Sequence, residues 1–524
     1  MKHRLVFLAD LHLSERDDTA AAAVLQWAIE QIETLRPDAV VVGGDMTTYA
    51  GVGAATRLVE ALEGLEMPVL QTLGNAEHRG PAARPVLAPF TDPARRWLEL
   101  GEVLVLAPDT STGALPAAER AWLQETAAGS RSSRVVVCTH YPLDVLEADS
   151  QSWLRTWLQE NRVELLVAGH RHTQQQQQLG TTTIVVVRGL DPDKAMGDWP
   201  GLDLFASEGP GKWDHRPVAW TPPLQLLPAQ VPGNVAPVGW SIHADPVEAV
   251  HETLEYGLSC LELRPPELNY SRPALAAGLR DWRAGGPSYL SYHLPGLTWD
   301  EAAADFADLD AVRAHLDRAL EVQADSLTMH VPQAPARLMA VESPVYAAYL
   351  EAWEELFAAP VQQGMRLAIE NVHNPPATPL VHPERKFATS IEEYTAWIEA
   401  VEQRLASGRN EAVGALFDVG HARNNGGELD NSQPLGDWYA RVGARILGYH
   451  IHQVNRAPQN GRLANHLEID SFFGGRISYA GFWWAWSTGQ IRRAPLFIEI
   501  RDHQARRRTA RRFLAWFSQG VAQS

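Results

Sequence analysis

Short apolar runs rich in β-branched residues and leucine recur along the chain, separated by segments whose apolar positions have helical spacing. In the first part of the sequence, six such runs are predicted as buried strands: residues 4–10, 38–45, 68–75, 134–140, 163–170 and 182–189. Five of the six end in a polar residue that can bind a metal ion. This alternation predicts an α/β fold in which chemistry is presented at the ends of buried strands.

A second, more regular pattern begins near residue 238 and has the alternating strand–helix order of a (β/α)₈ barrel. Amphipathic helices are predicted at 248–256 and 311–322, among others. The predicted strands are residues 238–244, 259–265, 287–295, 326–332, 366–374, 414–422, 446–454 and 495–502. Such a barrel carries its active site at the C-terminal ends of its strands.

The stretch between these patterns, residues 191–237, is rich in Pro, Gly and Trp and is predicted as closing β-structure of the first domain followed by a linker. The predicted organisation is therefore a first domain over 1–215, a linker over 216–237 and a barrel over 238–524. A five-glutamine run at 174–178 is predicted to be a solvated turn.

Composition narrows the class of protein. The 524 residues carry a formal net charge of -18, which argues against gripping long nucleic acid through a broad basic surface. The basic cluster at 501–513 is predicted as the solvated face of a last helix. Cys138 and Cys260 lie inside apolar runs and are predicted to be buried thiols. Without a signal peptide or a long apolar window, we expect a cytoplasmic protein with no membrane segment.

The polar residues at the ends of the first set of strands occur in a characteristic order. Along the chain they are Asp10 and His12 in ADLH, Asp45 in GGD, Asn75 in GN, His140 in TH, and His170 and His172 in GHRH. Any one of these motifs occurs by chance, but all five in order resemble the calcineurin-like metallophosphoesterases over about residues 1–190. The resemblance implies an α/β sandwich with two metal ions. Polar groups satisfied within a core are the alternative reading.

The chemistry of such a site explains the residue types. Two cations held ~3.5–4 Å apart clamp a phosphate, polarise it and acidify a water near neutral pH. By resemblance, one metal (Mn, Fe or Zn) would be bound by Asp10, His12, Asp45 and His172. The other would be bound by Asp45, Asn75, His140 and His170, and the resemblance marks Asp45 and His140 as catalytic.

The residue after Asn75 departs from the family pattern, because it is Ala76 where a histidine normally lies near the leaving group. General acid catalysis of that kind contributes typically 10²–10⁴-fold. Three explanations remain open. The substrate has a good leaving group, or His78 replaces the missing histidine as a catalytic residue, or the site binds phosphate slowly or only structurally.

The predicted barrel also carries polar residues at its strand ends, including two or three carboxylates with imidazoles, a set that suits Zn, Mn or Fe. The motifs AIEN, FDVGH, YHIHQVN and PLFIEI resemble the xylose isomerase-like barrel superfamily over about residues 238–520. That superfamily contains sugar isomerases, epimerases and endonuclease IV. The ligand set of the isomerase and epimerase branch is matched by Glu370, Asp418, His452 and Glu499.

The endonuclease IV branch adds ligands for a three-metal cluster, and His293, His330, His421 and His466 lie where those would fall. The loop with His466 departs from that pattern, since Ala464 takes the place of an aspartate. The resemblance therefore implies one to three metals and leaves the third in doubt.

Several barrel residues have two readings from sequence alone. His450 is read mainly as a barrel-interior residue. Glu262 contacts substrate or pairs with Arg264 or a nearby loop. Arg385 and Lys386 grip a phosphate or, more simply, are solvated. Most of the 18 tryptophans are expected in the core.

We therefore predict a two-domain metalloenzyme. The first domain hydrolyses a phosphoester or phosphoanhydride, and the barrel acts on a sugar- or nucleotide-like small molecule. In an isomerase or epimerase, Glu370 and Glu499 would be both metal ligands and candidate bases; in a phosphodiesterase, the histidines would hold extra metals. The alternatives are a DNA-repair nuclease and a non-catalytic metal-binding scaffold. The sequence does not predict the oligomeric state.

Overall fold

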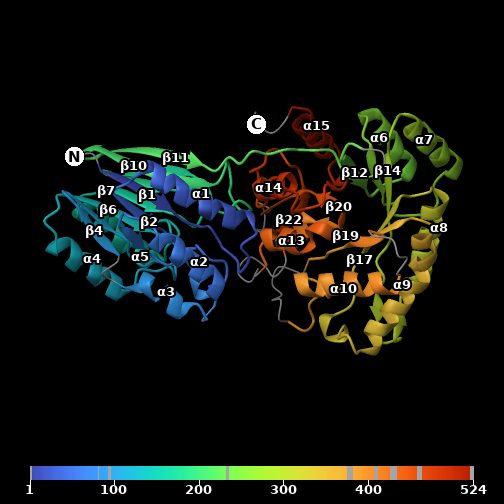
Figure 1. The fold of residues 1–524 in the computed structure, drawn as a ribbon, viewed down its shortest axis with the longest axis horizontal. Helices are drawn as coiled ribbons and strands as arrows, with labels where there is room; N and C mark the ends of the chain where they lie inside the picture. The colour runs from blue at the N-terminus through green and yellow to red at the C-terminus, as the bar shows by residue number, and fades with distance from the viewer. Residues whose placement is uncertain are drawn as a thin grey trace. The chain divides into compact units, whose positions relative to one another are not determined.

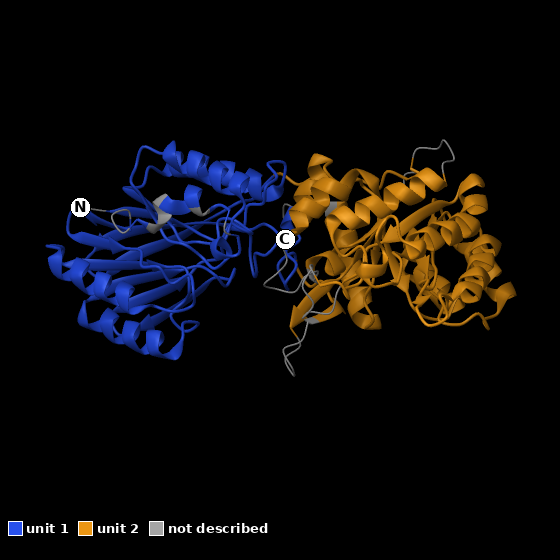
Figure 2. Ribbon diagram, turned by 90° about the horizontal axis from the view of Figure 1, so that it is seen from below, with its two compact units in different colours: residues 1–222, 472–481 blue, residues 223–471, 482–524 orange. Residues whose placement is uncertain are grey.

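The computed structural model describes residues 3–80, 82–92, 96–231, 235–373, 382–405, 411–424, 433–456 and 463–519. The chain divides into two compact units (Figures 1 and 2). Unit 1 comprises residues 1–222 with 472–481, and unit 2 comprises residues 223–471 with 482–524.

Unit 1 contains two β-sheets. The first has the order β11-β10-β1-β2-β3, in which β1, β2 and β3 are parallel. Its strands are β1 (Arg4–Leu8), β2 (Ala39–Val42), β3 (Val69–Gln71), β10 (Gly201–Gly209) and β11 (Lys212–Ala219). The second has the order β4-β5-β6-β7-β9-β8. Its strands are β4 (Trp97–Leu100), β5 (Val103–Leu106), β6 (Arg134–Thr139), β7 (Val163–Ala168), β8 (Gln175–Leu179) and β9 (Thr182–Val186).

Successive side chains of a strand point to opposite faces of its sheet. Each sheet therefore has one apolar face that packs against the other sheet. On β6, Val136 and Cys138 join Phe7 and Val41 in the core between the sheets. Val137 points the other way, against Leu154 of the covering helix α5. The helices are α1 (Ala20–Leu35), α2 (Val52–Glu63), α3 (Arg84–Thr91), α4 (Ala117–Gly129) and α5 (Ala148–Glu160), with a 3₁₀ turn η1 (Ala76–His78). Unit 1 is thus an α/β sandwich, as predicted.

Two details of unit 1 differ from the sequence prediction. The glutamine run was predicted to be a turn, but residues 175–178 belong to β8, an exposed strand paired antiparallel with β9. This edge strand is held by backbone hydrogen bonds to β9, and its glutamine side chains are exposed. Its sequence therefore lacks the alternation of hydrophobic and polar residues by which strands are predicted. The hairpin of β4 and β5 was not predicted either. The side chains of β4 alternate between exposed and half-buried, which gives a weak signal, whereas β5 is a short apolar run that is buried and was nevertheless missed.

Unit 2 is a closed barrel of eight parallel strands in the order β12-β13-β14-β17-β18-β19-β20-β23. All eight coincide with predicted strands. Their bounds are β12 (Val238–Ile242), β13 (Cys260–Leu263), β14 (Tyr289–His293), β17 (Ser326–His330), β18 (Arg366–Glu370), β19 (Val413–Asp418), β20 (Ile446–Ile451) and β23 (Leu496–Ile498). Closure comes from the pairing of β12 with β23.

Helices surround the barrel (Figure 1). They are α6 (Pro246–Tyr256), α7 (Arg272–Ala284), α8 (Leu309–Glu321), α9 (Pro344–Gln362), α10 (Ile391–Arg404), α11 (Val419–Asn424), α13 (Leu435–Val442), α14 (Ala480–Thr488) and α15 (His503–Gln519). Two small hairpins, β15 (Trp299–Asp300) with β16 (Asp305–Phe306) and β21 (Gln453–Arg456) with β22 (Leu463–Leu467), lie in the loops, as do the turns η3 (Ala336–Leu338) and η4 (Gly443–Arg445).

The two ends of the barrel differ in chemistry. Val231 and Val235, from the segment before β12, pack with Cys260 and Phe497 in an apolar cluster. These barrel residues precede the polar strand ends, so the apolar cluster occupies the N-terminal end of the barrel and the chemistry collects at the other end. Both cysteines are free and buried, as predicted. Six tryptophans are fully buried: Trp240, Trp353, Trp397, Trp438, Trp483 and Trp486.

In the described part of the chain, no helix combines the length and the apolar character needed to cross a membrane.

Candidate metal centres

The predicted ligands of unit 1 lie in the loops that follow β1, β2, β3, β6 and β7. Their backbone is unusual. Thirteen non-glycine residues of the described chain have a positive φ, and five of them are predicted ligands of this unit: Asp10, His12, Asp45, His170 and His172. Such conformations are costly and gather at functional sites. The loops therefore turn sharply at each strand end and direct the side chains towards one place.

One group consists of Asp10, His12 and His172, whose ligand atoms all lie within 4.8 Å of one another. The Nε2 atoms of His12 and His172 are 3.3 Å apart, and their rings are stacked. Asp10 accepts hydrogen bonds from the backbone N–H of His170 at 2.8 and 3.0 Å. Two imidazole nitrogens that face each other beside a carboxylate can bind one cation placed between them.

The second group consists of Asp45, His140 and His170. His140 Nε2 lies 3.2 Å from Asn75 Oδ1 and 3.5 Å from Asp45 Oδ1. His140 Nδ1 donates to the Gly43 carbonyl at 2.9 Å, which leaves the Nε2 lone pair facing the site. The other oxygen of Asp45, Oδ2, lies 3.7 Å from His12 Nε2. Asp45 thus offers one oxygen to each group, as expected of a bridging ligand.

The electrostatics of this site also favour cations. Burial raises the pKa of Asp10, and the nearby Asp45 carboxyl raises it further. Burial lowers the pKa of His140 to about 4. The pKa of His170 is also lowered to about 4, first by burial and then by the neighbouring His140. Carboxylates crowded together beside neutral imidazoles suit divalent metal ions, whose charge reverses these trends.

The Asn75 loop shows what surrounds the position of the missing histidine. Ala76 is fully buried, and its N–H donates to Asp45 Oδ1 at 2.7 Å. His78 is exposed, with its ring nitrogen 2.6 Å from Ser111 Oγ. It lies outside both ligand groups. Arg79 is half-buried and donates to the Thr48 carbonyl at 3.2 Å. Burial lowers the pKa of His12 and His140 and raises that of Asp45; the positive charge of Arg79 adds to the lowering at the two histidines and opposes the rise at Asp45, so this cation lies near the centre.

Glu77 is a residue of this site that the sequence reasoning missed. Its buried carboxylate accepts hydrogen bonds from the N–H groups of Asp45, Thr47 and Gly74 at 2.8–2.9 Å, and from the Thr47 hydroxyl at 2.9 Å. Gly74 must be glycine, because a Cβ there would lie 2.2 Å from Asp45 Oδ1. Glu77 therefore fastens the Asp45 loop to the Asn75 loop. The sequence signal was an acidic residue two positions after Asn75.

In the barrel, the Glu370 carboxylate at the end of β18 lies close to two predicted histidines at the ends of β14 and β17. His293 Nε2 lies 2.8 Å and His330 Nε2 3.2 Å from Glu370 Oε2. Burial alone would raise the pKa of Glu370, but His330 and His450 outweigh it and hold that pKa well below its usual value. Burial lowers the pKa of His330 to about 3.

Asp418, His452, His466 and Glu499 extend the cluster. His452 Nε2 lies 3.2 Å from Asp418 Oδ1, and His466 Nδ1 lies 3.7 Å from Glu499 Oε2. His421 Nδ1 is 3.5 Å from both Glu370 and Asp418. The ligand atoms form three groups: His293, His330 and Glu370; His452, His466 and Glu499; and Glu370, Asp418, His450 and Glu499.

His450 lies in the barrel interior and links this cluster to a deeper carboxylate. Its Nδ1 is 3.2 Å from Glu370 and 3.1 Å from Glu499, while its Nε2 is 2.6 Å from Glu262. Glu262 also accepts from the hydroxyls of Ser241 and Thr328. It contacts neither of the partners named from sequence, since the fully buried Glu262 pairs with His450 while Arg264 pairs with Glu499 at 2.6 Å.

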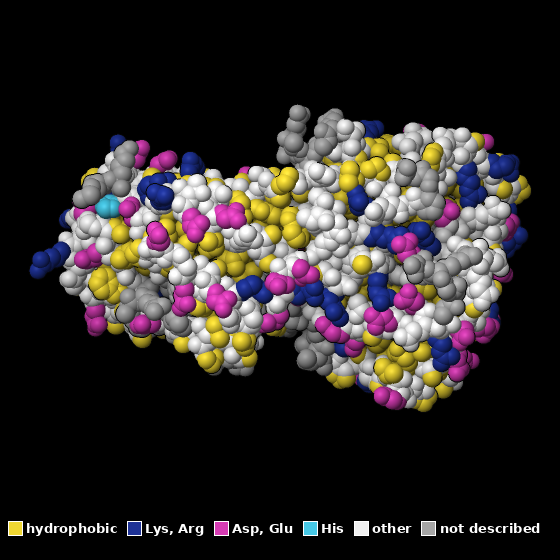
Figure 3. All heavy atoms as spheres, viewed as in Figure 1, with side chains coloured by type: hydrophobic (Ala, Val, Ile, Leu, Met, Phe, Trp, Pro, Cys, Tyr) yellow, Lys and Arg dark blue, Asp and Glu magenta, His cyan; other side chains and the backbone are white. Residues whose placement is uncertain are grey.

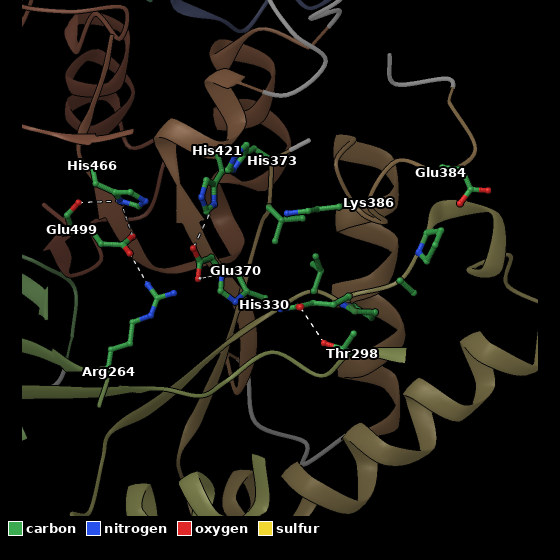
Figure 4. A pocket seen from close by; sticks show the side chains of 16 residues that line it. Arg264, Thr298, His330, Glu370, His373, Glu384, Lys386, His421, His466 and Glu499 are labelled. Atoms are coloured by element: carbon green, nitrogen blue, oxygen red, sulfur yellow. Dashed lines mark hydrogen bonds and ion pairs between the residues drawn. The ribbon is translucent and has the colours of Figure 1, made fainter. Parts of the chain in front are cut away.

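A pocket of ≈ 500 Å³ opens over these groups (Figure 4). Its lining includes a histidine that the sequence reasoning missed, His373, whose ring lies 4.8 Å from that of His421. The signal was its position three residues after Glu370. The charged and imidazole side chains of the lining are Arg264, His330, Glu370, His373, Glu384, Lys386, His421, His466 and Glu499.

Both units therefore contain buried groups of carboxylates and imidazoles whose chemistry fits divalent metals. The structure brings the predicted ligands together at the strand ends, with His78 as the exception among the predicted site residues of unit 1. The ligand and catalytic roles of these individual residues stay predictions.

Comparison with known proteins identifies the two units. The family model described as xylose isomerase-like TIM barrel matches residues 250–519, and that described as calcineurin-like phosphoesterase matches residues 3–174. No curated protein matches the chain.

Three similar solved structures have low scores. A D-tagatose 3-epimerase-like protein is 16% identical, with a TM-score of 0.35, and the match covers 54% of this chain and 99% of that one. The IOLI protein with a bound zinc atom is 13% identical, with a TM-score of 0.37, over 54% and 95% of the two chains. GAP50, the anchor in the inner membrane complex of Plasmodium, is 13% identical, with a TM-score of 0.33, over 42% and 84%.

The barrel match spans half of the chain, and the strand-end carboxylates and histidines of both units agree with the two matches. The protein belongs to the xylose isomerase-like TIM barrel family and carries in addition an N-terminal calcineurin-like phosphoesterase domain.

Proposed function

We propose that unit 1 hydrolyses a phosphoester or phosphoanhydride with two divalent metal ions, and that the barrel acts on a sugar- or nucleotide-like small molecule with one to three. The observation that carries the first part is the position of Asp45 between the two ligand groups: its Oδ1 lies 3.5 Å from His140 of its own group, and its Oδ2 lies 3.7 Å from His12 of the other. Bound divalent cations supply Lewis-acid polarisation of a phosphoryl oxygen and acidify water.

The residues of unit 1 then have distinct tasks. Asp45 holds the two ligand groups together, and the Gly43 carbonyl fixes the tautomer in which His140 Nε2 faces the site. At the position where the family pattern has a histidine, this chain has Ala76, whose methyl group cannot donate a proton. We therefore propose a substrate whose leaving group departs without protonation, such as a phosphoanhydride or an acidic alcohol.

For the barrel, an isomerase or epimerase is the first proposal, with Glu370 and Glu499 as metal ligands and candidate bases. A barrel phosphodiesterase is the second, and the observation that favours it is the presence of three ligand groups instead of one. On the face shown in Figure 3, basic and acidic side chains are interspersed, which supports a small substrate over long nucleic acid. The two buried thiols support a cytoplasmic location.

The test is hydrolysis of an aryl phosphomonoester and a bis-aryl phosphodiester with added Mn²⁺. We expect Asp45→Asn to lower kcat/KM by on the order of 100-fold or more, because the shared ligand is lost. An alkyl phosphate, with a poor leaving group, should be hydrolysed far more slowly than the aryl ester by the wild-type protein, since no acid replaces the missing histidine.

Two further variants locate the activity. Asp310→Asn, an almost fully exposed carboxylate, serves as the matched control and should act like wild type. Loss of phosphodiester hydrolysis in Glu370→Ala alone would assign that reaction to the barrel. Full activity of Asp45→Asn on both esters would reject the proposed role of unit 1.

A further inference from the structure

The barrel pocket contains two cationic side chains beside the candidate metal ligands. Arg264 follows β13, and Lys386 lies in the loop before α10. Figure 4 shows Lys386 extending into the pocket with its ammonium end towards His421 and His373, and Arg264 reaching Glu499 from another part of the wall. A cavity open to water and lined by metal ligands and cations is suited to a substrate that is itself charged.

The loop around Lys386 is held in place by its neighbours. Arg385 pairs with Glu393 at 2.5 Å, and Glu393 also accepts from the N–H of Ala388 at 3.1 Å. The Ala336 N–H donates to the Arg385 carbonyl at 2.8 Å, and the Phe387 N–H donates to the Ala334 carbonyl at 3.1 Å. The two basic residues of this loop thus have different tasks: Arg385 anchors the backbone, and Lys386 is directed into the cavity.

Solvation by itself is the simpler reading of Lys386, since the residue as a whole is exposed. Its environment differs from that of an ordinary surface lysine, however. Desolvation in the pocket lowers the pKa of its ammonium group below the ordinary value. Lys386 and Arg264 line the same cavity, and the loop that carries Lys386 is held by backbone hydrogen bonds on both sides. The cavity therefore presents two cationic groups to an anionic substituent of a bound molecule.

Arg264 complements this group from the metal side. Its guanidinium donates to Glu499 Oε1 at 2.6 Å and retains 28% exposure of its side chain. A guanidinium has five N–H donors in a fork, so one carboxylate contact leaves donors for a second oxyanion.

We propose that the barrel substrate carries a phosphate group, which Lys386 binds with help from Arg264, while the rest of the molecule lies against the candidate metal ligands. This inference rests on the proposed function of the barrel and names its substrate class: a phosphorylated sugar-like molecule. The volume of ≈ 500 Å³ lies within the range of small-molecule sites. Thr298 and Gln333, hydrogen-bonded to each other at 3.2 Å, line the wall and offer polar groups to hydroxyls.

The probe for the test is inorganic phosphate, titrated by calorimetry into the full-length, Mn²⁺-loaded protein. An Asp45→Asn background weakens the centre of unit 1, so that the barrel dominates the signal. Lys386→Gln in this background should weaken phosphate binding about tenfold, the loss expected for one charge-assisted contact. Lys386→Arg keeps the charge and should retain binding within about threefold.

Lys212→Gln is the matched control, because it removes the same charge from an exposed position on β11 that does not line the pocket. Three outcomes would overturn the proposal. Lys386→Gln could bind phosphate as tightly as its parent, Lys212→Gln could lose as much affinity as Lys386→Gln, or the parent could bind no phosphate. A parallel Mn²⁺ titration of Glu370→Ala separates the two ideas. If Glu370→Ala binds as many Mn²⁺ ions as its parent, the proposed metal centre of the barrel is rejected. If Lys386→Gln nevertheless weakens phosphate binding, the proposed phosphate site is retained.

Discussion

At the scale of single residues, the strained backbone is the clearest mark of function in this chain. His466, together with the five ligands of unit 1, makes six predicted ligands among the thirteen non-glycine residues with positive φ in the described chain. Each such conformation costs of order 1–3 kcal/mol and persists only where the surrounding structure enforces it. A chain that keeps these conformations at its strand ends is held there by neighbours, and Glu77 is one of them: its carboxylate accepts hydrogen bonds from the N–H groups of Asp45 and Gly74.

Glu77→Gln tests this positioning role. The amide nitrogen cannot accept a hydrogen bond, so the N–H groups now bound to one carboxylate oxygen lose their acceptor. Leaving buried donors unsatisfied costs about 1–3 kcal/mol of unfolding free energy. The distorted Asp45 loop should also bind Mn²⁺ about 10–100-fold more weakly. Denaturant unfolding without metal and a Mn²⁺ titration measure the two effects.

Glu63→Gln, at the exposed end of α2, is the control for the change of charge and should leave both quantities unchanged. A Glu77→Gln protein with wild-type Mn²⁺ affinity would show that the hydrogen bonds of Glu77 do not position the ligands.

At the scale of elements, hydrophobic pattern explains most of what was predictable. The eight barrel strands and six strands of unit 1 are apolar runs and were found, whereas β8 carries glutamines and β4 alternates between exposed and half-buried positions. The exception is β5, a buried apolar run of four residues that was missed. Ligand residues were predictable because they directly follow buried strands. Lys386 was a candidate phosphate contact from sequence, but the direction of its loop depends on contacts such as the Arg385–Glu393 ion pair. Glu77 was missed because its role depends on hydrogen bonds from the N–H groups of other residues, and sequence alone does not contain those distances.

The last helix illustrates how an element with a plain sequence signal acquires a specific attachment. Most of the basic cluster lies in the last helix, α15, as predicted, but the cluster is not simply a solvated face, because Arg506 is buried. Four of its arginines pair with acidic partners: Arg506, Arg507, Arg508 and Arg512. Arg508 and Arg512 contact Glu468 at 2.6 and 2.8 Å. The hydrogen bonds of Arg508, followed by those of Arg512, lower the pKa of Glu468 from 4.5 to about 2.

This shift predicts a pH dependence. Because the folded-state pKa lies below the unfolded value, the ion pairs stabilise the fold fully above about pH 4.5, and their contribution is lost as the pH falls from there towards 2. Glu468→Gln should therefore lower Tm at pH 6 and show a smaller fall in Tm than wild type as the solution is acidified. Thermal melts across pH 6 to 3 measure both.

Glu342→Gln, on an exposed turn before α9, is the comparison variant. Parallel Tm curves for wild type and Glu468→Gln over this range would show that the Glu468 ion pairs do not contribute to acid sensitivity.

At the scale of the whole molecule, the sequence predicted two metal-dependent folds in one chain, and the family comparisons agree. The substrates were not predictable, because one fold hosts many reactions and specificity depends on the lining of the site. Each unit has its own hydrophobic core and its own ligand groups. Metal binding should consequently stabilise each unit through its own centre.

Metal removal and replacement test this independence. A metal that binds only the folded state stabilises it by about 2.7 kcal/mol at a free concentration 100 times Kd. Chelator treatment of the wild-type protein should lower Tm, and Mn²⁺ should restore it. In Asp45→Asn the Mn²⁺-dependent gain of unit 1 should shrink while that of the barrel persists, and Glu370→Ala should show the reverse. Calorimetric scans measure the gain in Tm, and hydrogen exchange assigns each unfolding transition to unit 1 or to the barrel.

If both variants keep the full gain of the wild-type protein, the stabilising Mn²⁺ binds elsewhere. If either variant abolishes the gain of both units, the two centres are coupled, and the barrel and the phosphoesterase unit must then be studied as one metal-binding system.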